Sequence, residues 1–536
     1  MKNDALYYPY PSSRTVCYAK NGMVATSQPL AAQAGLDILK KGGNAIDAAV
    51  STAACLTVVE PTSNGIGSDA FALVWVKDQL HGLNASGPAP RSISIEAVRS
   101  KGFDEMPEYG WTPVTVPGAP AAWASLIRRF GRLTLPEVLE PAVRYAEGGY
   151  PISPTSGDHW DRAFQRYRAE LTGTEFDNWF HTFAPGGRAP IVGEIWHSKD
   201  HAQTLQRIGE TDAEAFYRGE LAEKIDYFSR QNNGFLRADD LAAYQPEWVE
   251  PICINYRGFD IWEIPPNGQG LIALLALNIV KGFDFDCKDS VDTCHKQIEA
   301  LKLAFTDGNA YITDSRQMTV SPESLFQDAY ASARRRLIGD TAMLPAAGSP
   351  GRSGTVYLAT ADGEGNMVSY IQSNYMGFGS GIVVPETGIA LHNRGHTFSL
   401  DPAHSNCLAP GKKTFHTIIP GFITRGPRAV GPFGVMGGFM QPQGHMQVVM
   451  NMVDFQLNPQ AALDAPRWQW LNDKSVVVEN AFPNHIVQAL ARKGHDISVA
   501  PDSSGFGRGQ IICRDPDTGI LSGGTEPRTD GHIAVW

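Results

Sequence analysis

The 536-residue chain is longer than one ordinary hydrophobic core allows, so we expect about two or three domains or a single large layered domain. Its residues are 43% hydrophobic and 19% charged, which is typical of a folded globular protein and excludes a disordered chain. The formal net charge of -11 is spread without acidic runs and argues against nucleic acids and anionic membrane surfaces as partners.

The N-terminal segment, residues 1–22, has no apolar core of signal-peptide length. No later stretch offers about 18 uninterrupted apolar residues, so we expect no membrane span. The seven cysteines are odd in number and form no CxxC pair, which favours reduced thiols in a cytoplasmic protein. They stand at positions 17, 55, 253, 287, 294, 407 and 513.

Residues 23–60 contain the clearest predicted helices. Ser27 is the expected N-cap of the first helix, because a serine oxygen can accept a backbone N–H there, and Pro29 lies in its first turn. The alanine-rich run 44–58 predicts a second, buried helix. A glycine turn and a hairpin follow it, and residues 118–150 and 200–250 are mostly helical by period.

After residue 355 the pattern changes to short apolar stretches separated by turns, which predicts a meander of antiparallel strands. Two short helices are expected near the end, at 459–465 and 486–493. Because strands are predicted on both sides of residue 355, a layered fold with central strands from both halves is the simplest architecture. The predicted strands are TVYLATAD, GNMVSYIQS, GIVV, GIAL and part of TIIPGFIT.

Three motifs are first compared with the known patterns of a dinucleotide-binding loop, a zinc site and a nucleophile elbow. The run 65–70 fits GxGxxA, but no strand precedes it and a strand-like segment follows it, so a close-approach turn is favoured over a dinucleotide loop. His392 and His396, with His404 and Cys407 nearby, lie in a segment that glycine and proline keep from being helical, which argues against a zinc site. The run 377–381 has its serine one position too late for a nucleophile elbow.

Thr355 follows Gly354 in SPGRSGTVYLATAD. A threonine that opens a strand is usually a simple β-former. A threonine with a free α-amine can instead act as a nucleophile, because an amine with a pKa of about 7.7–8.0 can serve as its base at neutral pH. Glycine before it would not obstruct attack by the hydroxyl on the preceding carbonyl. Both interpretations of Thr355 stay open on these residues alone.

Blocks along nearly the whole chain resemble the γ-glutamyltranspeptidase family, N-terminal nucleophile hydrolases that are made as one self-cleaving precursor. The similar blocks occur in the family's order, and TVYLATADGEGNMVS matches the start of its small subunit without a gap. They are MVATSQPLAAQAGLDILKKGGNAIDAAV, VVEPTSNGIGSDAF, PPNGQGLIALLALNIVKGFD, EALKLAFTD, GSGIVVPETGIAL, LDAPRWQW and EPRTDGHIAVW.

The resemblance implies an αββα sandwich, two stacked antiparallel sheets between helical layers. It implies cleavage into a helix-rich large subunit, 1–354, and a strand-rich small subunit, 355–536, which build the sheets jointly and stay associated. It places the nucleophile at Thr355, the cleaved bond at Gly354–Thr355, a hydroxyl that contacts the nucleophile's amine at Ser373, and the oxyanion hole at Gly437–Gly438. It implies no cofactor and no metal.

The chain departs from the family where an amino-acid head group would bind. The usual arginine for the substrate carboxylate falls near Ser86, and the usual acid for the substrate ammonium falls at Thr397. The usual serine pair reads His416–Thr417, and the usual asparagine reads Tyr375, next to Asn374. With Arg394 and His396, these residues could bind a carboxylate but offer no evident partner for an ammonium.

The resemblance therefore favours hydrolysis of a small amide that carries a carboxylate and lacks an α-amino group. One branch of the family hydrolyses oxamate, the last amide in a purine-degradation route, and oxamate is the predicted substrate. A γ-glutamyltransferase or glutathione hydrolase with a rearranged pocket is the first alternative. An unprocessed, non-enzymatic binding protein is the second.

Overall fold

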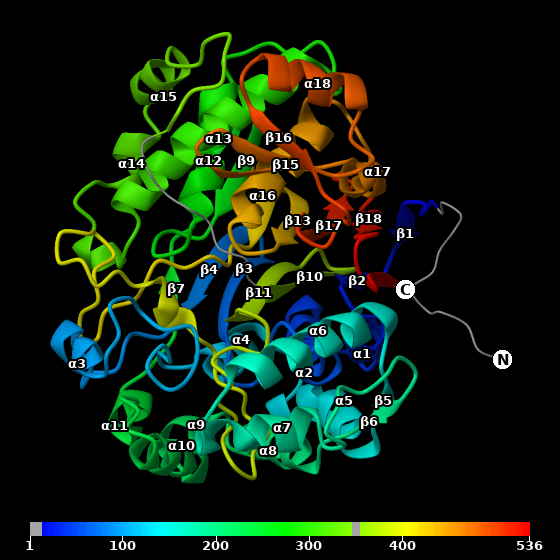
Figure 1. Ribbon diagram of the computed structural model, residues 1–536. Helices are drawn as coiled ribbons and strands as arrows, with labels where there is room; N and C mark the ends of the chain where they lie inside the picture. Colours follow the sequence, from blue (N-terminus) through cyan, green and yellow to red (C-terminus); the bar gives the residue numbers. More distant parts are fainter. Residues whose placement is uncertain (1–12, 346–353) are drawn as a thin grey trace.

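The computed structural model describes residues 13–345 and 354–536. Two seven-stranded sheets stack face to face, and helices cover the outer face of each (Figure 1). This is the expected αββα sandwich, and the predicted fold class is confirmed. The predictions for the first 12 residues and for most of the loop SPGRSG lie outside the described residues.

The first sheet, called the β10 sheet, places strands from both sides of residue 355 next to one another. Its central strand β10 pairs with β2 on one edge and with β11 on the other, both antiparallel. In order, the strands are β19 (His532–Val535), β2 (Gly22–Thr26), β10 (Gly354–Asp362), β11 (Met367–Tyr375), β3 (Asp69–Val76), β4 (Gln79–Ala85) and β7 (Glu247–Val249).

The second sheet, called the β13 sheet, is also built from both halves of the chain. Because each sheet mixes strands from before and after residue 355, a cut at that point would leave two pieces joined by both sheets. In order, the strands are β1 (Cys17–Ala19), β18 (Leu521–Thr525), β17 (Arg508–Arg514), β13 (Arg428–Met436), β12 (Gly421–Arg425), β9 (Phe259–Glu263) and β8 (Ile252–Tyr256).

Strand β10 shows how the sandwich is held together. Its side chains alternate, so Val356 and Leu358 pack into the helix-side core while Tyr357 and Ala359 pack between the two sheets. Gly434 on β13 leaves room for the Tyr357 ring, since a Cβ there would lie 2.4 Å from a ring atom. The same alternation along β11 sends Ile371 between the sheets.

The helices form the two outer layers. On the β10 sheet, every residue of α2 is buried, and Asn44 caps the helix in a capping box with Asp47. The N-cap of α1 is Gln28, whose side-chain oxygen accepts the N–H groups of Leu30 and Ala31. The prediction of Ser27 was wrong, because its hydroxyl instead donates to the buried Glu60 carboxylate.

The described helices before residue 355 outnumber those after it, as predicted (Figure 1). They are α1 (Pro29–Lys40), α2 (Ala45–Val59), α3 (Ile95–Ser100), α4 (Ala119–Phe130), α5 (Leu135–Gly148), α6 (Pro154–Glu170), α7 (Asp177–Phe183), α8 (Lys199–Glu210), α9 (Glu214–Arg218), α10 (Glu220–Gln231), α11 (Ala238–Ala242), α12 (Gly270–Val280), α13 (Val291–Tyr311), α14 (Pro322–Leu325), α15 (Asp328–Arg335), α16 (Met440–Val453), α17 (Pro459–Asp464) and α18 (Asn484–Arg492).

Smaller elements complete the chain. The 3₁₀ turns are η1 (Thr174–Phe176), η2 (Ser315–Gln317) and η3 (Arg394–Thr397); the small sheets are β14 (Trp468–Asn472), β15 (Ser475–Val478) and β16 (Asp496–Val499), and β5 (Tyr150–Pro151) with β6 (Ile195–Trp196). GIVV and GIAL are not strands: they form only the isolated bridges Val383–Ala390 and Gly67–Leu391, because Gly381, Glu386 and Gly388 have positive φ.

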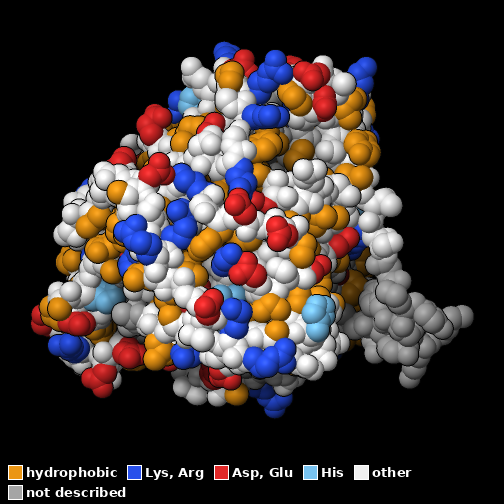
Figure 2. Space-filling model, turned by 90° about the horizontal axis from the view of Figure 1, so that it is seen from above, with side chains coloured by type: hydrophobic (Ala, Val, Ile, Leu, Met, Phe, Trp, Pro, Cys, Tyr) orange, Lys and Arg blue, Asp and Glu red, His pale blue; other side chains and the backbone are white. Residues whose placement is uncertain are grey.

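The surface agrees with the charge pattern of the sequence. Acidic and basic side chains are interspersed over the face shown in Figure 2. All seven cysteines lie in the described part of the chain as free thiols. In residues 13–345 and 354–536, no helix is both long enough and apolar enough to cross a bilayer.

Candidate active site

Thr355 lies at the start of β10, on the side that faces the β13 sheet. The threonine is fully buried. Its Oγ1 lies 3.1 Å from the Oγ of Ser373, which also accepts the N–H of Tyr375 at 2.8 Å. The structure thus brings together two of the residues that the resemblance assigned to catalysis.

A row of polar side chains crosses three neighbouring strands here. Thr355 lies on β10, Ser373 lies on β11, and Asp69 is the register partner of Ser373 on β3. Register partners in an antiparallel pair point to the same face, and two strand spacings amount to about 10 Å. The side chains of Thr355 and Asp69 therefore lie on the same face of the β10 sheet, about 10 Å apart.

Asp69 is fully buried among nitrogen donors. Its Oδ2 lies 2.8 Å from His416 Nε2 and 3.5 Å from Arg394 Nε, and its Oδ1 lies 3.7 Å from His392 Nε2. Burial raises the pKa of the Asp69 carboxyl to about 7, although the positive charge of Arg394 opposes the rise. Burial lowers the pKa of His392 to about 3 and that of His416 well below its usual range.

Arg394 is a fully buried guanidinium with one edge left open. Its Nη1 donates to Thr417 Oγ1 at 2.7 Å, and its carbon lies 4.5 Å from the centre of the Tyr375 ring. Within the described chain, Nη2 has no hydrogen-bond partner. Burial lowers the pKa of Arg394 to about 10, so the group still carries its charge at neutral pH. Asp69, His392, Arg394, His416 and Thr417 are called the Arg394 cluster below.

Gly437 and Gly438 form the turn between β13 and α16, and both have positive φ, 130° and 61°. Gln269 holds this turn, because its Nε2 donates to the carbonyl oxygens of Gly438 at 2.8 Å and Thr417 at 2.5 Å. Outside the helix and strand ladders of the described chain, neither glycine N–H donates to a backbone carbonyl. The turn therefore offers two N–H groups of the kind that stabilise an oxyanion.

Two of the residues predicted to bind substrate have side chains that are used to hold loops. Ser86 Oγ donates to Asn84 Oδ1 at 2.7 Å within a buried amide network that includes Asn267. Thr397 Oγ1 lies 2.8 Å from the Arg394 carbonyl oxygen and braces η3.

Asn374 and His396 point to partners outside the Arg394 cluster. Asn374 Oδ1 accepts from Ser68 Oγ at 2.9 Å, while its buried Nδ2 has no partner in the described chain. His396 Nδ1 lies 2.7 Å from the Met106 carbonyl oxygen. Among the predicted binding residues, the structure therefore gathers Tyr375, Arg394, His416 and Thr417 and leaves Ser86, Asn374 and Thr397 in other contacts.

The motifs set aside in the sequence have structural explanations. Gly67 lies in a close-approach turn, since a Cβ there would lie 2.4 Å from the Ala390 carbonyl oxygen. His404 accepts the N–H of Asn406, and His392 faces Asp69, so the histidines of the zinc hypothesis do not converge.

In the described part of the chain, His295, Glu299 and His495 lie close enough to hold a metal ion. The ammonium of Lys302 already lies 2.7 Å from Glu299 Oε1 and is fully buried. His295 Nε2 lies 2.8 Å from the Gly339 carbonyl oxygen, and Glu299 accepts the N–H of Met343. Lys302 supplies the positive charge that a metal would bring, so the cluster is better explained as a clamp on residues 339–343.

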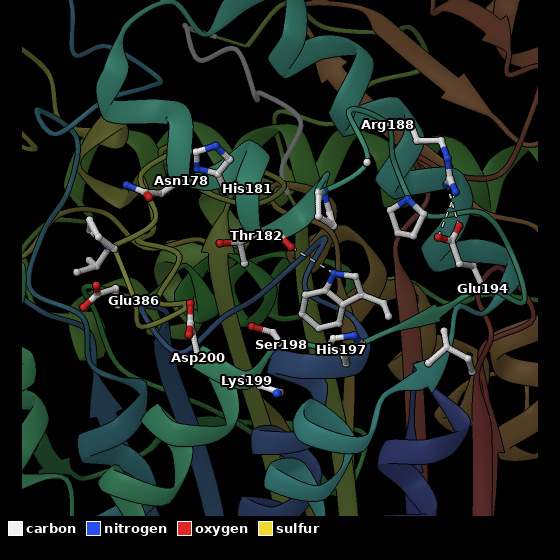
Figure 3. Close-up of a pocket in the computed structure, with 17 residues that line it drawn as sticks. Asn178, His181, Thr182, Arg188, Glu194, His197, Ser198, Lys199, Asp200 and Glu386 are labelled. Atoms are coloured by element: carbon white, nitrogen blue, oxygen red, sulfur yellow. Dashed lines mark hydrogen bonds and ion pairs between the residues drawn. The ribbon is translucent and has the colours of Figure 1, made fainter.

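A surface cavity lies elsewhere, between α7, the start of α8 and residues 384–386 (Figure 3). It has a volume of about 480 Å³ and shares no residue with the row at Thr355. Its Arg188 and Glu194 pair with each other, as Figure 3 shows, and both are at least one-third exposed. It lacks the buried, unpartnered charge that distinguishes the Arg394 cluster.

Sequence reasoning missed Asp69 and Gln269 as parts of the site. Asp69 stands in VVEPTSNGIGSDAF and Gln269 in PPNGQGLIALL, two of the blocks that carried the resemblance. An acid that ends a glycine-rich turn and opens a buried strand was the available signal for Asp69. The predicted set of binding residues contained no acid, and Asp69 corrects this. The Asp69 carboxylate already contacts Arg394 and His416.

The comparisons with known proteins agree with this geometry. The family model for gamma-glutamyltranspeptidase matches residues 31–536. The "Glutathione hydrolase-like YwrD proenzyme" of Bacillus subtilis is 36% identical, with 95% of this chain and 97% of the relative covered. The "Oxamate amidohydrolase proenzyme" of Klebsiella pneumoniae is 32% identical, with 96% and 98% covered. The crystal structure of a cephalosporin acylase from Bacillus halodurans is 65% identical, with a TM-score of 0.98 over 100% of this chain and 99% of that one.

Proposed function

The chain belongs to the gamma-glutamyltranspeptidase family of N-terminal nucleophile amidohydrolases, and from that premise we propose that it hydrolyses a small amide whose acyl part carries a carboxylate. Oxamate, which would give oxalate and ammonia, is the first substrate to test. The observation that carries the proposal is the open edge of Arg394, a buried cation beside the Thr355–Ser373 row.

The charges of the Arg394 cluster support a carboxylate over a γ-glutamyl head group. A carboxylate can accept from Nη2 of Arg394 in a charge-assisted hydrogen bond. The ammonium of a γ-glutamyl group would need a free acid, and Asp69 already accepts from His416 and faces Arg394. An ammonium beside a buried guanidinium would also be repelled.

In the proposed reaction, cleavage of the Gly354–Thr355 bond first frees the α-amine of Thr355 and separates residues 1–354 from 355–536. Thr355 Oγ1 then attacks the amide carbon and its proton passes to the α-amine, while the N–H groups of Gly437 and Gly438 stabilise the oxyanion. The amine returns the proton to the leaving nitrogen, and the C–N bond breaks. Water attacks the resulting ester and releases the acid and Thr355.

A second candidate differs in the leaving group. The 65% identical structure is described as a cephalosporin acylase, so a larger amine in place of ammonia is the alternative for this chain. Both candidates require the same acyl group at Arg394 and Thr355. They differ only in what occupies the other side of the scissile bond.

A panel of matched amides separates these possibilities. Purified protein is incubated with oxamate, with oxamide, with succinamate and with glutathione, and released ammonia or glutamate is measured. Oxamide matches oxamate except for the carboxylate, so we expect turnover of oxamate or succinamate and little of oxamide. Glutathione turnover without ammonia from either acid amide would overturn the proposal. N-alkyl forms of the preferred acid amide then test the acylase alternative.

A further inference from the structure

Arg394 would face two acids at once if a substrate carboxylate bound at its unpartnered Nη2. Asp69 lies 3.5 Å from Arg394 Nε, and the substrate carboxylate of the proposed function would lie at Nη2 of the same guanidinium. All of these atoms are fully buried. Two carboxylates that share one site in a low-dielectric interior do not both stay ionised, because each raises the pKa of the other.

Among the described side chains, none around Asp69 supplies a second unpaired positive charge, and the α-amine that cleavage frees at Thr355 lies two strands away along the row. His392 and His416 face it from either side, and burial holds both pKa values below their usual range, so both rings are neutral at neutral pH. The charge of Lys413 acts on Asp69, but its Nζ lies 2.9 Å from a carboxylate oxygen of Glu247 and is paired. The remaining titratable neighbours are the buried phenols of Tyr217 and Tyr244, whose pKa values burial raises well above their usual range.

We propose that Asp69 takes up a proton from water when a carboxylate binds Arg394, so that the pocket binds its acidic substrate together with one proton. This inference rests on the proposed function. The proton is placed on Oδ1, because Oδ2 accepts the N–H of His416 and faces Arg394, while Oδ1 has neighbours only at 3.4 Å, the N–H of Gly87, and 3.7 Å. Asp69 is a positioning residue in this scheme. Before the substrate binds, the Asp69 carboxylate neutralises the charge of Arg394, and once Asp69 is protonated that charge pairs with the substrate carboxylate instead.

The buried state of Asp69 supports this exchange, because desolvation has already raised its pKa to about 7. Near that pH the empty site is about half protonated, so binding should draw in about half a proton per site. Above that pH, Asp69 is ionised before the ligand binds, so binding should take up one full proton per site. The affinity should then fall by up to about tenfold per pH unit. Below about pH 6 the site is already protonated and the uptake should vanish.

Proton uptake can be measured without turnover. The self-cleaved protein is titrated calorimetrically with oxalate and with succinate, at several pH values and in two buffers of different ionisation enthalpy, which gives the protons bound per ligand. We expect uptake in wild type that Asp69→Asn removes, with binding by Asp69→Asn independent of pH. Asp78→Asn, an exposed change at the other end of β3, is the control and should behave as wild type.

The outcomes distinguish this inference from the proposed function. Binding of a dicarboxylate with no proton uptake in wild type overturns the role of Asp69 and leaves the carboxylate site intact. Uptake that persists unchanged in Asp69→Asn also overturns it. Failure of both dicarboxylates to bind overturns the carboxylate site itself, and both proposals with it. Where Asp69→Asn fails to fold, the pH dependence of uptake by wild type decides: uptake through Asp69 falls away below about pH 6, whereas uptake through the Thr355 α-amine, with a pKa of about 7.7–8.0, would fall away below about pH 7 and overturn the role of Asp69.

Discussion

Two groups of buried, charged side chains in this protein each combine arginine with acidic residues, and they differ in how completely the arginine donors are paired. The first is the Arg394 cluster. The second, called the Arg467 network, consists of Arg467, Glu479, Glu526 and Arg528, from the blocks LDAPRWQW and EPRTDGHIAVW and the strand end between them. All four residues are nearly inaccessible, and two acids face two arginines.

The difference lies in how completely the donors are paired. Arg467 donates to the carbonyl oxygens of Phe506 and Gly507 and to Glu526, and Arg528 binds both acids and two further carbonyls. None of these side-chain donors is without a partner in the described chain. Nη2 of Arg394 is. A fully paired buried charge is part of the framework, whereas an unpartnered buried charge such as Nη2 of Arg394 needs an explanation, which the proposed substrate carboxylate would supply.

The largest expected effect belongs to Thr355, beside the Arg394 cluster. Thr355→Ala removes the hydroxyl, so we expect no self-cleavage and a loss of activity of at least about 10⁴-fold. Denaturing electrophoresis should show one band near 58.2 kDa in place of two fragments. Mass spectrometry of the wild-type small fragment should give Thr355 as its first residue. Self-cleavage that persists in Thr355→Ala would place the nucleophile elsewhere.

A substitution in the Arg467 network should lower the free energy of unfolding and leave the catalytic rate unchanged. Glu526→Ala leaves Arg467 and Arg528 with an uncompensated buried charge, which costs about 3–5 kcal/mol. We expect a lower urea midpoint of unfolding, with activity per folded molecule retained. The exposed change Glu364→Ala, which removes only a surface ion pair with Arg132, is the control and should shift the midpoint little. An unchanged midpoint in Glu526→Ala would show that the Arg467 network does not stabilise the fold.

Local sequence patterns predicted much of the framework. The alanine-rich run at 44–58 and the alternating strand after Thr355 are both present, since each depends on neighbours in the chain. GIVV and GIAL failed because the backbone of Gly381 and Gly388, not side-chain propensity, sets that segment. The partners of the Arg467 network could not be read from the sequence, because Arg467 and Glu526 are 59 residues apart.

The candidate site was predicted unevenly for the same reason. Thr355, Ser373 and the glycine pair came from the family resemblance, and the structure places the first two in contact. Arg394, His416 and Thr417 were named, but their arrangement depends on Asp69, which lies 347 residues from His416 in sequence. Ser86 and Thr397 were named by alignment alone, and hydrogen bonds to Asn84 and to the Arg394 carbonyl occupy them.

Arg394 should separate binding from stability. Arg394→Met keeps an apolar stem in place of the guanidinium, and Asp69, whose pKa burial has already raised to about 7, can take up a proton in place of the lost charge, so we expect a smaller fall in the urea midpoint than in Glu526→Ala. Loss of the charge should lower kcat/KM for an acid amide by about 10²–10³-fold, because the substrate carboxylate would be buried without a partner. Arg394→Lys, which keeps a charge without the planar fork, should recover part of this loss. Equal activity in Arg394→Met would show that the open edge is not used.

The smallest expected effect is at Ser373, and it tests whether the row at Thr355 is chemical or structural. Ser373 Oγ lies 3.1 Å from Thr355 Oγ1 and accepts the N–H of Tyr375. Ser373→Ala removes both contacts, and loss of the one to Thr355, worth about 1 kcal/mol, should lower kcat roughly five- to tenfold. Ser373→Thr keeps the hydroxyl and should restore the rate, which distinguishes the role of the oxygen from that of side-chain volume. A loss in Ser373→Ala that appears only in the urea midpoint would assign Ser373 to the framework, with the Arg467 network.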